Sequence, residues 1–387
     1  MGAEPGAFPG QVAGDGATGV IHVAHSLDGL EGGGVGRYVH ALVGAQGALG
    51  LRSTAVSSAD LGPADGGFRG SWDQPARVSR LVAMVRGAGA RPVVHLHHLS
   101  GLGFGVVAAA KAAGARVVVT THDHWIGCPR GQRIDRWGQR CEEPDVGRCA
   151  RCLRPDGLPG PLGRGRVRER MSAVRKLQPD LWLSVAEHLR PGAELTDLPL
   201  LQAPAAILPH DGPVRFLFVG SLIPSKGVDL ALEAFRALPA GAATLDVVGP
   251  AVAWDGSMRF AAQLRARVSP GITLHPPGPT VPWYARSDIL LFPSRWDEGC
   301  PLVLREAASC GLHVLTSDVP GARRALGAYP AVWLPAGFPQ SPALAAWIAA
   351  LSLCVRGVPR HDPARFPTLQ AHAAGLIDRY AELFRAP

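Results

Sequence analysis

The sequence predicts an α/β protein with two doubly wound domains that face each other across a cleft. Short β-branched runs alternate with helical patterns, and one Pro-rich stretch near the middle interrupts the alternation. The length of 387 residues exceeds one ordinary core and fits two domains of roughly 150 to 200 residues each. With 47% hydrophobic and 18% charged residues, the composition is globular. We therefore expect two parallel sheets covered by helices.

The first segment, residues 1–17, predicts a disordered tail. It is rich in Gly, Ala and Pro and contains no Lys or Arg, so it lacks the charged start of a secretory signal. Nowhere do about eighteen apolar residues follow one another, so no membrane span is expected. We expect a cytoplasmic protein whose seven cysteines are reduced or metal-bound.

An N-terminal domain is expected over residues 18–195. Its β-branched runs lie between helical patterns, as in a parallel sheet with helical crossovers. The predicted strands are Val20–His25, Thr54–Ser57, Val93–His97, Val117–Thr121 and Leu181–Val185. Residues 126–160 form a Cys-containing, Gly- and Arg-rich insertion after the fourth strand.

A C-terminal domain is expected over residues 214–365, after a Pro-rich linker at 196–213. A last helix within 366–387 has apolar residues at helical spacing and is expected to pack back across the linker. Ligands of such sheets bind beyond the carboxyl ends of the strands. The predicted strands are Arg215–Val219, Leu245–Val248, Ile272–Leu274, Ile289–Phe292 and His313–Ser317.

The most specific motif follows the strand Ile289–Phe292 and contains Glu298 and Glu306, separated by seven residues. Between them, a Gly-x-Pro turn opens a helix, whose N-terminus can bind a diphosphate. The residues of this turn that are expected to bind the diphosphate-containing ligand are Gly299, Cys300, Pro301, Leu302 and Val303. Glu306 is placed to accept hydrogen bonds from a ribose diol. A surface loop with an ordinary helix carboxylate remains an alternative for the two glutamates alone.

A second motif joins the strand Arg215–Val219 to the next helix and contains Gly220, Ser221, Lys226 and Gly227. The chain has only three lysines, and Lys226 lies where a phosphate would arrive at the strand end. Its charge could neutralise a departing diphosphate. The alternative is a solvated loop lysine.

Two weaker motifs lie at strand ends of the N-terminal domain. The run Gly32–Gly36 includes Gly33 and Gly34, whose missing side chains allow a ligand to approach the backbone. It lacks a complete G-x-G-x-x-G, which argues against dinucleotide binding. His122 could hydrogen-bond a sugar hydroxyl from its strand end, and a helix cap or a satisfied structural histidine is an equal alternative.

Taken together, these motifs resemble the retaining glycosyltransferases of family 4, which have the GT-B fold of two Rossmann-like domains. The resemblance covers nearly the whole chain from about Val20 and is strongest in the C-terminal half. The matching elements are Glu298 to Glu306, Lys226-Gly227 and the loop Gly32–Gly36. In the subgroup it resembles, a similar Cys-rich insertion follows the His-Asp-x-Trp segment.

The resemblance implies roles for single residues. Glu298 would hold the donor sugar, Glu306 the ribose and Lys226 the diphosphate leaving group, while His122 would orient the transferred sugar. The family is metal-independent, so no cofactor is expected for catalysis. Many members have Arg directly after the glycine that here is Gly220, whereas this chain has Ser221, which donates only a neutral hydrogen bond. His313 also replaces a proline common in the family, a difference expected to affect packing.

Four cysteines of the insertion, Cys128, Cys141, Cys149 and Cys152, predict one structural zinc. Four thiolates close a tetrahedral site and leave no open position for catalysis. Reduced or disulfide-paired cysteines are the alternative. The three other cysteines are interpreted as ordinary core or loop residues.

Positive charge is concentrated in one segment. Of the net charge of +8, the stretch Arg148–Lys176 contributes nine basic and two acidic residues. An excess this local does not favour nucleic-acid binding. The run Arg164–Lys176 predicts a basic helix, interpreted first as a solvated face and second as a peripheral contact with anionic lipid at the inner face of the plasma membrane, or with an anionic acceptor.

The sequence therefore predicts a retaining transferase that moves a sugar from a nucleoside-diphosphate sugar to an acceptor hydroxyl. The acceptor class is open between small molecules, lipid-linked molecules and glycans. The Arg-, Ala- and Gly-rich composition indicates GC-rich coding, which is associated with secondary-metabolite and cell-envelope glycan biosynthesis. The alternatives are a nucleotide-sugar epimerase of the same fold, a zinc-containing nucleic-acid-binding protein and a dinucleotide-dependent oxidoreductase.

Overall fold

The structure is a computed structural model of the 387-residue chain. It describes residues 18–27, 33–63, 74–153, 160–205, 208, 210–252, 257–335, 344–346, 348–349, 361–362 and 364–385. The predicted tail at 1–17, Gly32 and Cys354 lie outside these residues.

The N-terminal domain is built on a six-stranded sheet with the order β2-β1-β3-β4-β5-β6, in which every pairing is parallel. Buried parallel strands need apolar side chains on both faces, and five of the six residues of β3 are buried. The strands are β1 (Thr18–Ala24), β2 (Arg52–Ser57), β3 (Arg91–Leu96), β4 (Arg116–Thr121), β5 (Leu181–Ser184) and β6 (Glu194–Leu195). The helices are α1 (Gly33–Ala48), α2 (Pro75–Gly87), α3 (Gly105–Ala112), α4 (Val146–Cys152) and α5 (Gly160–Arg175).

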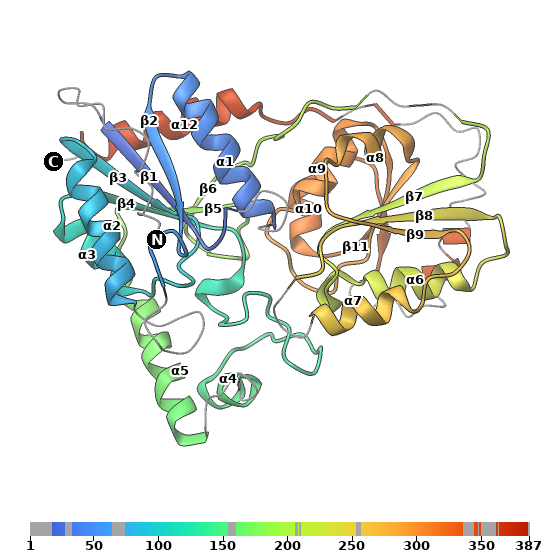
Figure 1. Ribbon diagram of the computed structural model, residues 1–387, viewed down its shortest axis with the longest axis horizontal. Coiled ribbons are helices and arrows are strands. Elements are labelled where there is room, and N and C mark those ends of the chain that lie inside the picture. Colours follow the sequence, from blue (N-terminus) through green and yellow to red (C-terminus); the bar gives the residue numbers. More distant parts are fainter. Residues whose placement is uncertain are drawn as a thin grey trace, which may run out of the picture.

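The C-terminal domain repeats this architecture with the parallel order β12-β11-β10-β7-β8-β9. Its strands are β7 (Val214–Val219), β8 (Ala243–Val248), β9 (Ile272–His275), β10 (Ile289–Phe292), β11 (His313–Ser317) and β12 (Val332–Leu334). Its helices are α6 (Val228–Arg236), α7 (Ser257–Arg265), α8 (Val281–Arg286), α9 (Leu302–Ser309) and α10 (Pro320–Leu326). The α/β fold class with two doubly wound domains is confirmed, and Figure 1 shows the two sheets side by side.

All ten predicted strands are present, with ends shifted by two residues or fewer. Strands β6 and β12, which contain only two and three residues, were not predicted. Strands this short offer too few residues for a pattern of alternation to be recognised. Of the described helices, none is both long and apolar enough to cross a membrane.

One continuous apolar core joins the two domains. It includes Leu42 of α1, Leu304 of α9 and Tyr380 of α12 (Leu369–Glu382), all buried. Although α12 is last in the sequence, it packs against α1 of the N-terminal domain (Figure 1). Just before α12, the Pro367 carbonyl accepts a hydrogen bond from the Leu200 N–H of the linker at 3.2 Å. The chain thus passes twice between the domains.

Candidate active site

Lys226 is positioned by a tight turn after β7. Residues Pro224–Lys226 form a 3-10 turn, and Gly227 follows it with φ = 71°. A Cβ atom at Gly227 would lie 2.0 Å from the Pro293 carbonyl oxygen, so only glycine allows the turn to lie against the end of β10. This close approach brings Lys226 of the second motif to Glu298 of the first.

Glu298 and Lys226 form an ion pair at the ends of β10 and β7. Lys226 Nζ donates to Glu298 Oε2 at 2.6 Å, and Ser294 Oγ donates to Glu298 Oε1 at 2.9 Å. Glu298 is only 5% exposed, so it is not a surface-loop residue. Within this partly buried site, the attraction between the charges is stronger than in bulk water. A carboxylate and a cation thus lie together at the carboxyl edge of the C-terminal sheet.

Glu306 lies within α9 and is bound from both domains. The Tyr284 hydroxyl of α8 donates to Glu306 Oε2 at 2.7 Å, and Arg37 Nη2 of α1 donates to Oε1 at 3.2 Å. Burial and the nearby carboxylate raise the pKa of Tyr284, so its hydroxyl remains protonated and donates. The sequence analysis missed both partners. Arg37 directly follows the Gly-rich run, but no local pattern reveals a partner in the other domain.

The donor-binding turn touches the N-terminal domain directly. A Cβ atom at Gly299 would lie 2.4 Å from the His122 carbonyl oxygen, and one at Gly34 would lie 3.9 Å from Leu302 Cδ1. Cys300 is buried, and Pro301 precedes the first turn of α9. The structure therefore places the predicted donor turn against His122 and against Gly34 of the Gly-rich loop.

The turn after β7 has a second close contact. A Cβ atom at Gly249 would lie 1.9 Å from the Gly220 carbonyl oxygen, so β8 ends against the beginning of this turn. Ser221 is half-buried in the turn, and its carbonyl accepts the Ile223 N–H at 2.9 Å. Gly220 and Ser221 thus lie on the path from β7 to Lys226.

His122 is the last member of a buried row of hydrogen bonds that we call the histidine chain: Gln46, His22, His97 and His122. Gln46 Oε1 lies 2.8 Å from His22 Nε2, His22 Nδ1 lies 3.0 Å from His97 Nε2, and His97 Nδ1 lies 3.1 Å from His122 Nε2. Burial lowers the pKa of His22 to about 4 and that of His122 to about 3. The imidazole rings are therefore neutral at pH 7.

The hydrogen bonds of the histidine chain all run in one direction, because the amide oxygen of Gln46 can only accept. His22 must donate from Nε2 to Gln46, so its neutral ring accepts at Nδ1 from His97. By the same reasoning, His97 accepts at Nδ1 from His122 Nε2. With the Gln46 amide in this orientation, His122 carries its hydrogen on Nε2 and has a free lone pair on Nδ1. Of these four residues only His122 was predicted from the sequence, because the other members come from separate segments of the chain.

The nearby trio of His22, His95 and His97 has ligand atoms within 4.8 Å of one another, which is a spacing that could suit a metal ion. Both nitrogens of each ring already have hydrogen-bond partners. Those of His95 contact the Tyr380 hydroxyl at 2.6 Å and Thr120 Oγ1 at 2.7 Å. The trio is explained as a satisfied polar network in the core.

A helix cap was one alternative for His122, and the neighbouring residue Asp123 is the cap in the structure. Asp123 Oδ1 accepts the Trp125 N–H at 2.7 Å and so caps the 3-10 turn His124–Ile126. The ring of His124 extends to the C-terminal domain, where Nε2 lies 3.0 Å from the Asp297 carbonyl oxygen. This segment therefore contacts the residue next to Glu298.

The basic helix α5 requires one correction. Arg170 is not on the solvated face, because it is 2% exposed and donates to the carbonyls of Trp125 and Ile126. Its guanidinium also lies over the Trp125 ring at 4.8 Å, and burial lowers its pKa to about 10. The other basic residues from Arg164 to Lys176 are exposed, while Val167 is buried against the protein. Helix α5 thus exposes positive charge to solvent, while its apolar side faces the core.

Two family models match the chain. The family described as Glycosyltransferase Family 4 matches residues 32–156, and the family described as Glycosyl transferases group 1 matches residues 213–355. The matched ranges fall in the N-terminal and C-terminal domains. No curated protein matches the chain significantly.

Solved structures share the whole architecture at low sequence identity. Sucrose-phosphate synthase from Thermosynechococcus elongatus has a TM-score of 0.63 at 16% identity, with 96% of this chain and 100% of that chain covered. A glycosyltransferase from Rickettsia africae has a TM-score of 0.60 at 12% identity, covering 96% and 100%. The protein HepE from Anabaena, solved with UDP and glucose, has a TM-score of 0.58 at 13% identity, covering 95% and 97%.

These likenesses show the GT-B fold over nearly the full length, and the sequence models add the family for each domain. The two matched families and the two parallel sheets agree with the family that the motifs resemble. The chain belongs to the family 4 glycosyltransferases of the GT-B fold.

Proposed function

We propose that this glycosyltransferase moves a sugar from a nucleoside-diphosphate sugar to an acceptor hydroxyl with retention of anomeric configuration. The bond between the anomeric carbon and the diphosphate oxygen breaks, and a bond to the acceptor oxygen forms on the same face. The acceptor proton passes to the departing diphosphate. The observation that carries the proposal is the Lys226–Glu298 pair, which lies next to the contact of Asp297 with His124 of the N-terminal domain.

The ion pair would exchange partners when the donor binds. Lys226 would turn from Glu298 to the diphosphate and neutralise the charge that develops as the sugar leaves. Glu298 would then be free to accept hydrogen bonds from the sugar hydroxyls, while Ser294 holds its other oxygen at 2.9 Å. With Lys226 in this role, the proposal needs no metal for catalysis.

The nucleotide would bind along the start of α9. The backbone from Gly299 to Val303 would approach the diphosphate, and Ser221 would add a neutral donor. Glu306 would exchange Arg37 for the ribose diol and keep its bond with Tyr284. A small pocket, with a cavity volume of about 10 Å³ in this structure, lies next to Glu306 and is lined by Gln202 and Tyr284, among others. The UDP and glucose complex of HepE supports a nucleotide-sugar donor for this fold.

His122 would orient the transferred sugar from the N-terminal side. Because the histidine chain fixes its tautomer, Nδ1 is available as an acceptor for a sugar hydroxyl. Gly33 and Gly34 would leave room for the acceptor beside the same cleft. Exposed cations of α5 offer an electrostatic contact for an anionic lipid surface or a lipid-linked acceptor. Secondary-metabolite and cell-envelope glycans remain the proposed settings.

The test supplies nucleoside-diphosphate sugars with a set of acceptor alcohols and follows diphosphate release. Proton NMR then assigns the anomeric configuration of the product. We expect diphosphate release with a retained linkage, and a loss of both in Glu298→Gln. An inverted linkage would contradict the proposed stereochemistry, and an epimerised sugar without transfer would favour the epimerase alternative.

A further inference from the structure

The insertion between β4 and α5 has little hydrophobic core of its own. Its regular structure within the described residues is the 3-10 turn His124–Ile126, the seven-residue helix α4 and one isolated bridge between Ile134 and Arg140. Among the residues that the structure describes, the buried apolar cluster beneath α4 contains Cys149, Ala150, Leu153 and Val167. A segment with so few apolar contacts needs another source of order.

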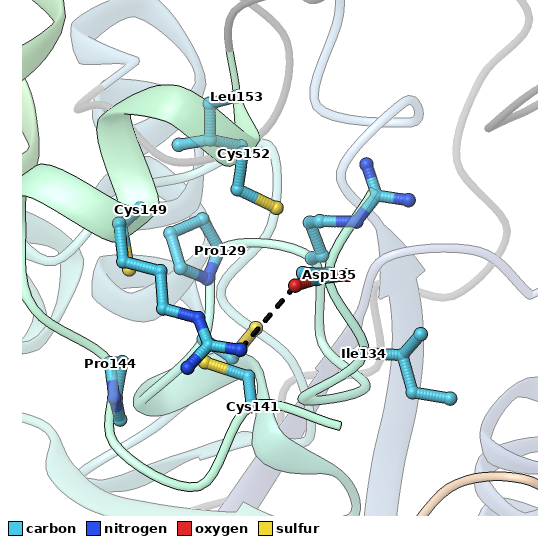
Figure 2. A pocket seen from close by; sticks show the side chains of 11 residues that line it. Pro129, Ile134, Asp135, Cys141, Pro144, Cys149, Cys152 and Leu153 are labelled. Atoms are coloured by element: carbon cyan, nitrogen blue, oxygen red, sulfur yellow. Dashed lines mark hydrogen bonds and ion pairs between the residues drawn. The ribbon is translucent and has the colours of Figure 1, made fainter. Parts of the chain in front are cut away.

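Four cysteines surround one pocket in this insertion. Cys128, Cys141, Cys149 and Cys152 are each 6% to 8% exposed, form no disulfide and line a cavity of about 20 Å³. Figure 2 shows Cys141, Cys149 and Cys152 around this pocket. The last two lie one turn apart on α4, and the others come from the loops before it. Two separate loops and a helix thus present thiols to one volume.

We propose that these four cysteines bind one structural zinc ion. With Zn–S bonds of about 2.3 Å, tetrahedral geometry places the sulfurs about 3.8 Å apart. No three of the four sulfurs lie within 4.8 Å of one another in the described chain, so binding requires them to move inward. Neither Cys128 nor Cys141 belongs to the buried apolar cluster around α4.

Arg148 connects the parts of the insertion that would move together when zinc binds. Its guanidinium lines the pocket and donates to Asp135 Oδ2 at 3.4 Å, drawn as the dashed line in Figure 2, and to the Arg140 carbonyl at 3.2 Å. Both bonds link the segment before Cys141 to the helix that carries Cys149 and Cys152. A cation between the thiolates would strengthen a connection that these bonds already make.

The metal would have a consequence at the donor site. Arg140, next to Cys141, forms an ion pair with Asp297, which is the neighbour of Glu298. The His124 ring also lies 3.0 Å from the Asp297 carbonyl oxygen. By fixing Cys141, zinc would hold Arg140 against the loop that carries Glu298. The proposal of a zinc site does not depend on the proposed function. Only the expected effect of zinc on turnover rests on the proposed function.

The first experiment measures metal in the full-length protein, purified without added metal or chelator. We expect one zinc per chain by plasma mass spectrometry, released when a mercurial reagent modifies the thiols. Iron with the absorption of an iron–sulfur cluster would overturn the assignment, because four thiolates also suit that cofactor. Two disulfides in place of four titratable thiols, or no stoichiometric metal, would overturn it as well.

The second experiment uses variants. Cys141→Ser and Cys152→Ser should each lose most of the zinc, while Cys310→Ser, a buried cysteine outside the insertion, should retain it. If the first two fail to fold, the metal content of the native protein still decides. Arg140→Ala should keep the zinc and lower turnover by up to about fivefold, as expected for a partly exposed ion pair. Loss of zinc in Arg140→Ala, or equal zinc in all cysteine variants, would contradict the proposal.

Discussion

At the scale of single residues, the cleft holds its charges in pairs before any donor binds. Lys226 is paired with Glu298, and Arg37 with Glu306. A site that keeps each buried carboxylate next to a cation avoids the cost of an isolated charge. The same pairing leaves a cation ready for an incoming diphosphate.

The first prediction concerns Lys226. Lys226→Ala should lower the rate of transfer by about 10² to 10³, the range found when one group that stabilises developing negative charge is removed. Steady-state kinetics with a saturating donor measure the effect. Lys111→Ala is the matched control, because Lys111 Nζ pairs with Asp180 at 3.2 Å far from the cleft. Unchanged turnover in Lys226→Ala would remove the lysine from the mechanism.

The second prediction concerns His97, which acts on the sugar only through His122. His97→Leu leaves the His122 Nε2–H without its acceptor, which should cost about 1 to 3 kcal/mol of stability. We also expect a lower kcat with little change in the donor KM. His97→Gln, whose amide can both accept and donate, should recover kcat.

The control for this pair is His40→Gln, since His40 is exposed on α1. If His97→Leu and His97→Gln lose kcat equally, the role of His97 is one of packing alone. Equal kinetics in all three variants would contradict any part for the histidine chain in catalysis.

At the scale of elements, the site depends on loops that only glycine can complete. Gly299 lies against the His122 backbone, and Gly321 at the start of α10 lies against Glu298, where a Cβ atom would be 1.9 Å from the carbonyl oxygen. These close contacts hold the donor turn between the end of β4 and the start of α10. Their precision matters because a misplacement of about 1 Å can cost a hundredfold in rate.

The third prediction tests this contact. Gly299→Ala places a Cβ atom 2.4 Å from the His122 carbonyl oxygen, so the donor turn and the His122 backbone must move apart. We expect kcat/KM to fall by about 10² with the fold retained by circular dichroism. Gly44→Ala is the control, since its added Cβ meets nothing within 4 Å on helix α1. That variant should gain about 0.5 to 1 kcal/mol of stability and keep its activity.

The elements also show what a sequence can predict. Ten strands followed from apolar runs, and the positions of Glu298, Lys226 and His122 followed from their place after those strands. Arg37 and Tyr284 could not be predicted, because their contact with Glu306 depends on how two domains and a distant helix meet. Arg170 continues the alternation of arginines along α5, so the sequence does not distinguish it from its solvated neighbours. Its burial depends on the packing of α5 against the rest of the domain.

At the scale of the whole molecule, stability should depend on buried neutral histidines. Burial lowers the pKa of His22, and likewise that of His372, to about 4, well below the ordinary value of 6.5. Unfolded histidines take up protons as the pH falls below 6.5, whereas these folded ones do so only near pH 4. The stability from each group is therefore complete above pH 6.5 and is lost as the pH falls toward 4.

The fourth prediction follows from that sign. Between pH 7.5 and pH 5.5, each such histidine should reduce the free energy of unfolding by about 1.4 kcal/mol. Denaturant titrations at the two pH values measure the sum. His22→Gln should show a smaller loss than the native chain, and His40→Gln should show the same loss. A stability that does not change across this range would contradict the burial of neutral rings.

The central claim is that a nucleoside diphosphate binds where Lys226 meets Glu298. Thermal shifts with UDP, GDP, dTDP, ADP and NAD, measured on the native chain, Lys226→Ala and Lys111→Ala, test it most directly. At a hundredfold excess over Kd, a ligand stabilises the folded state by about 2.7 kcal/mol. We predict that one nucleoside diphosphate raises the melting temperature of the native chain and of Lys111→Ala, and that Lys226→Ala loses the effect. A shift with NAD alone, or an equal shift in Lys226→Ala, would contradict the assignment of this site.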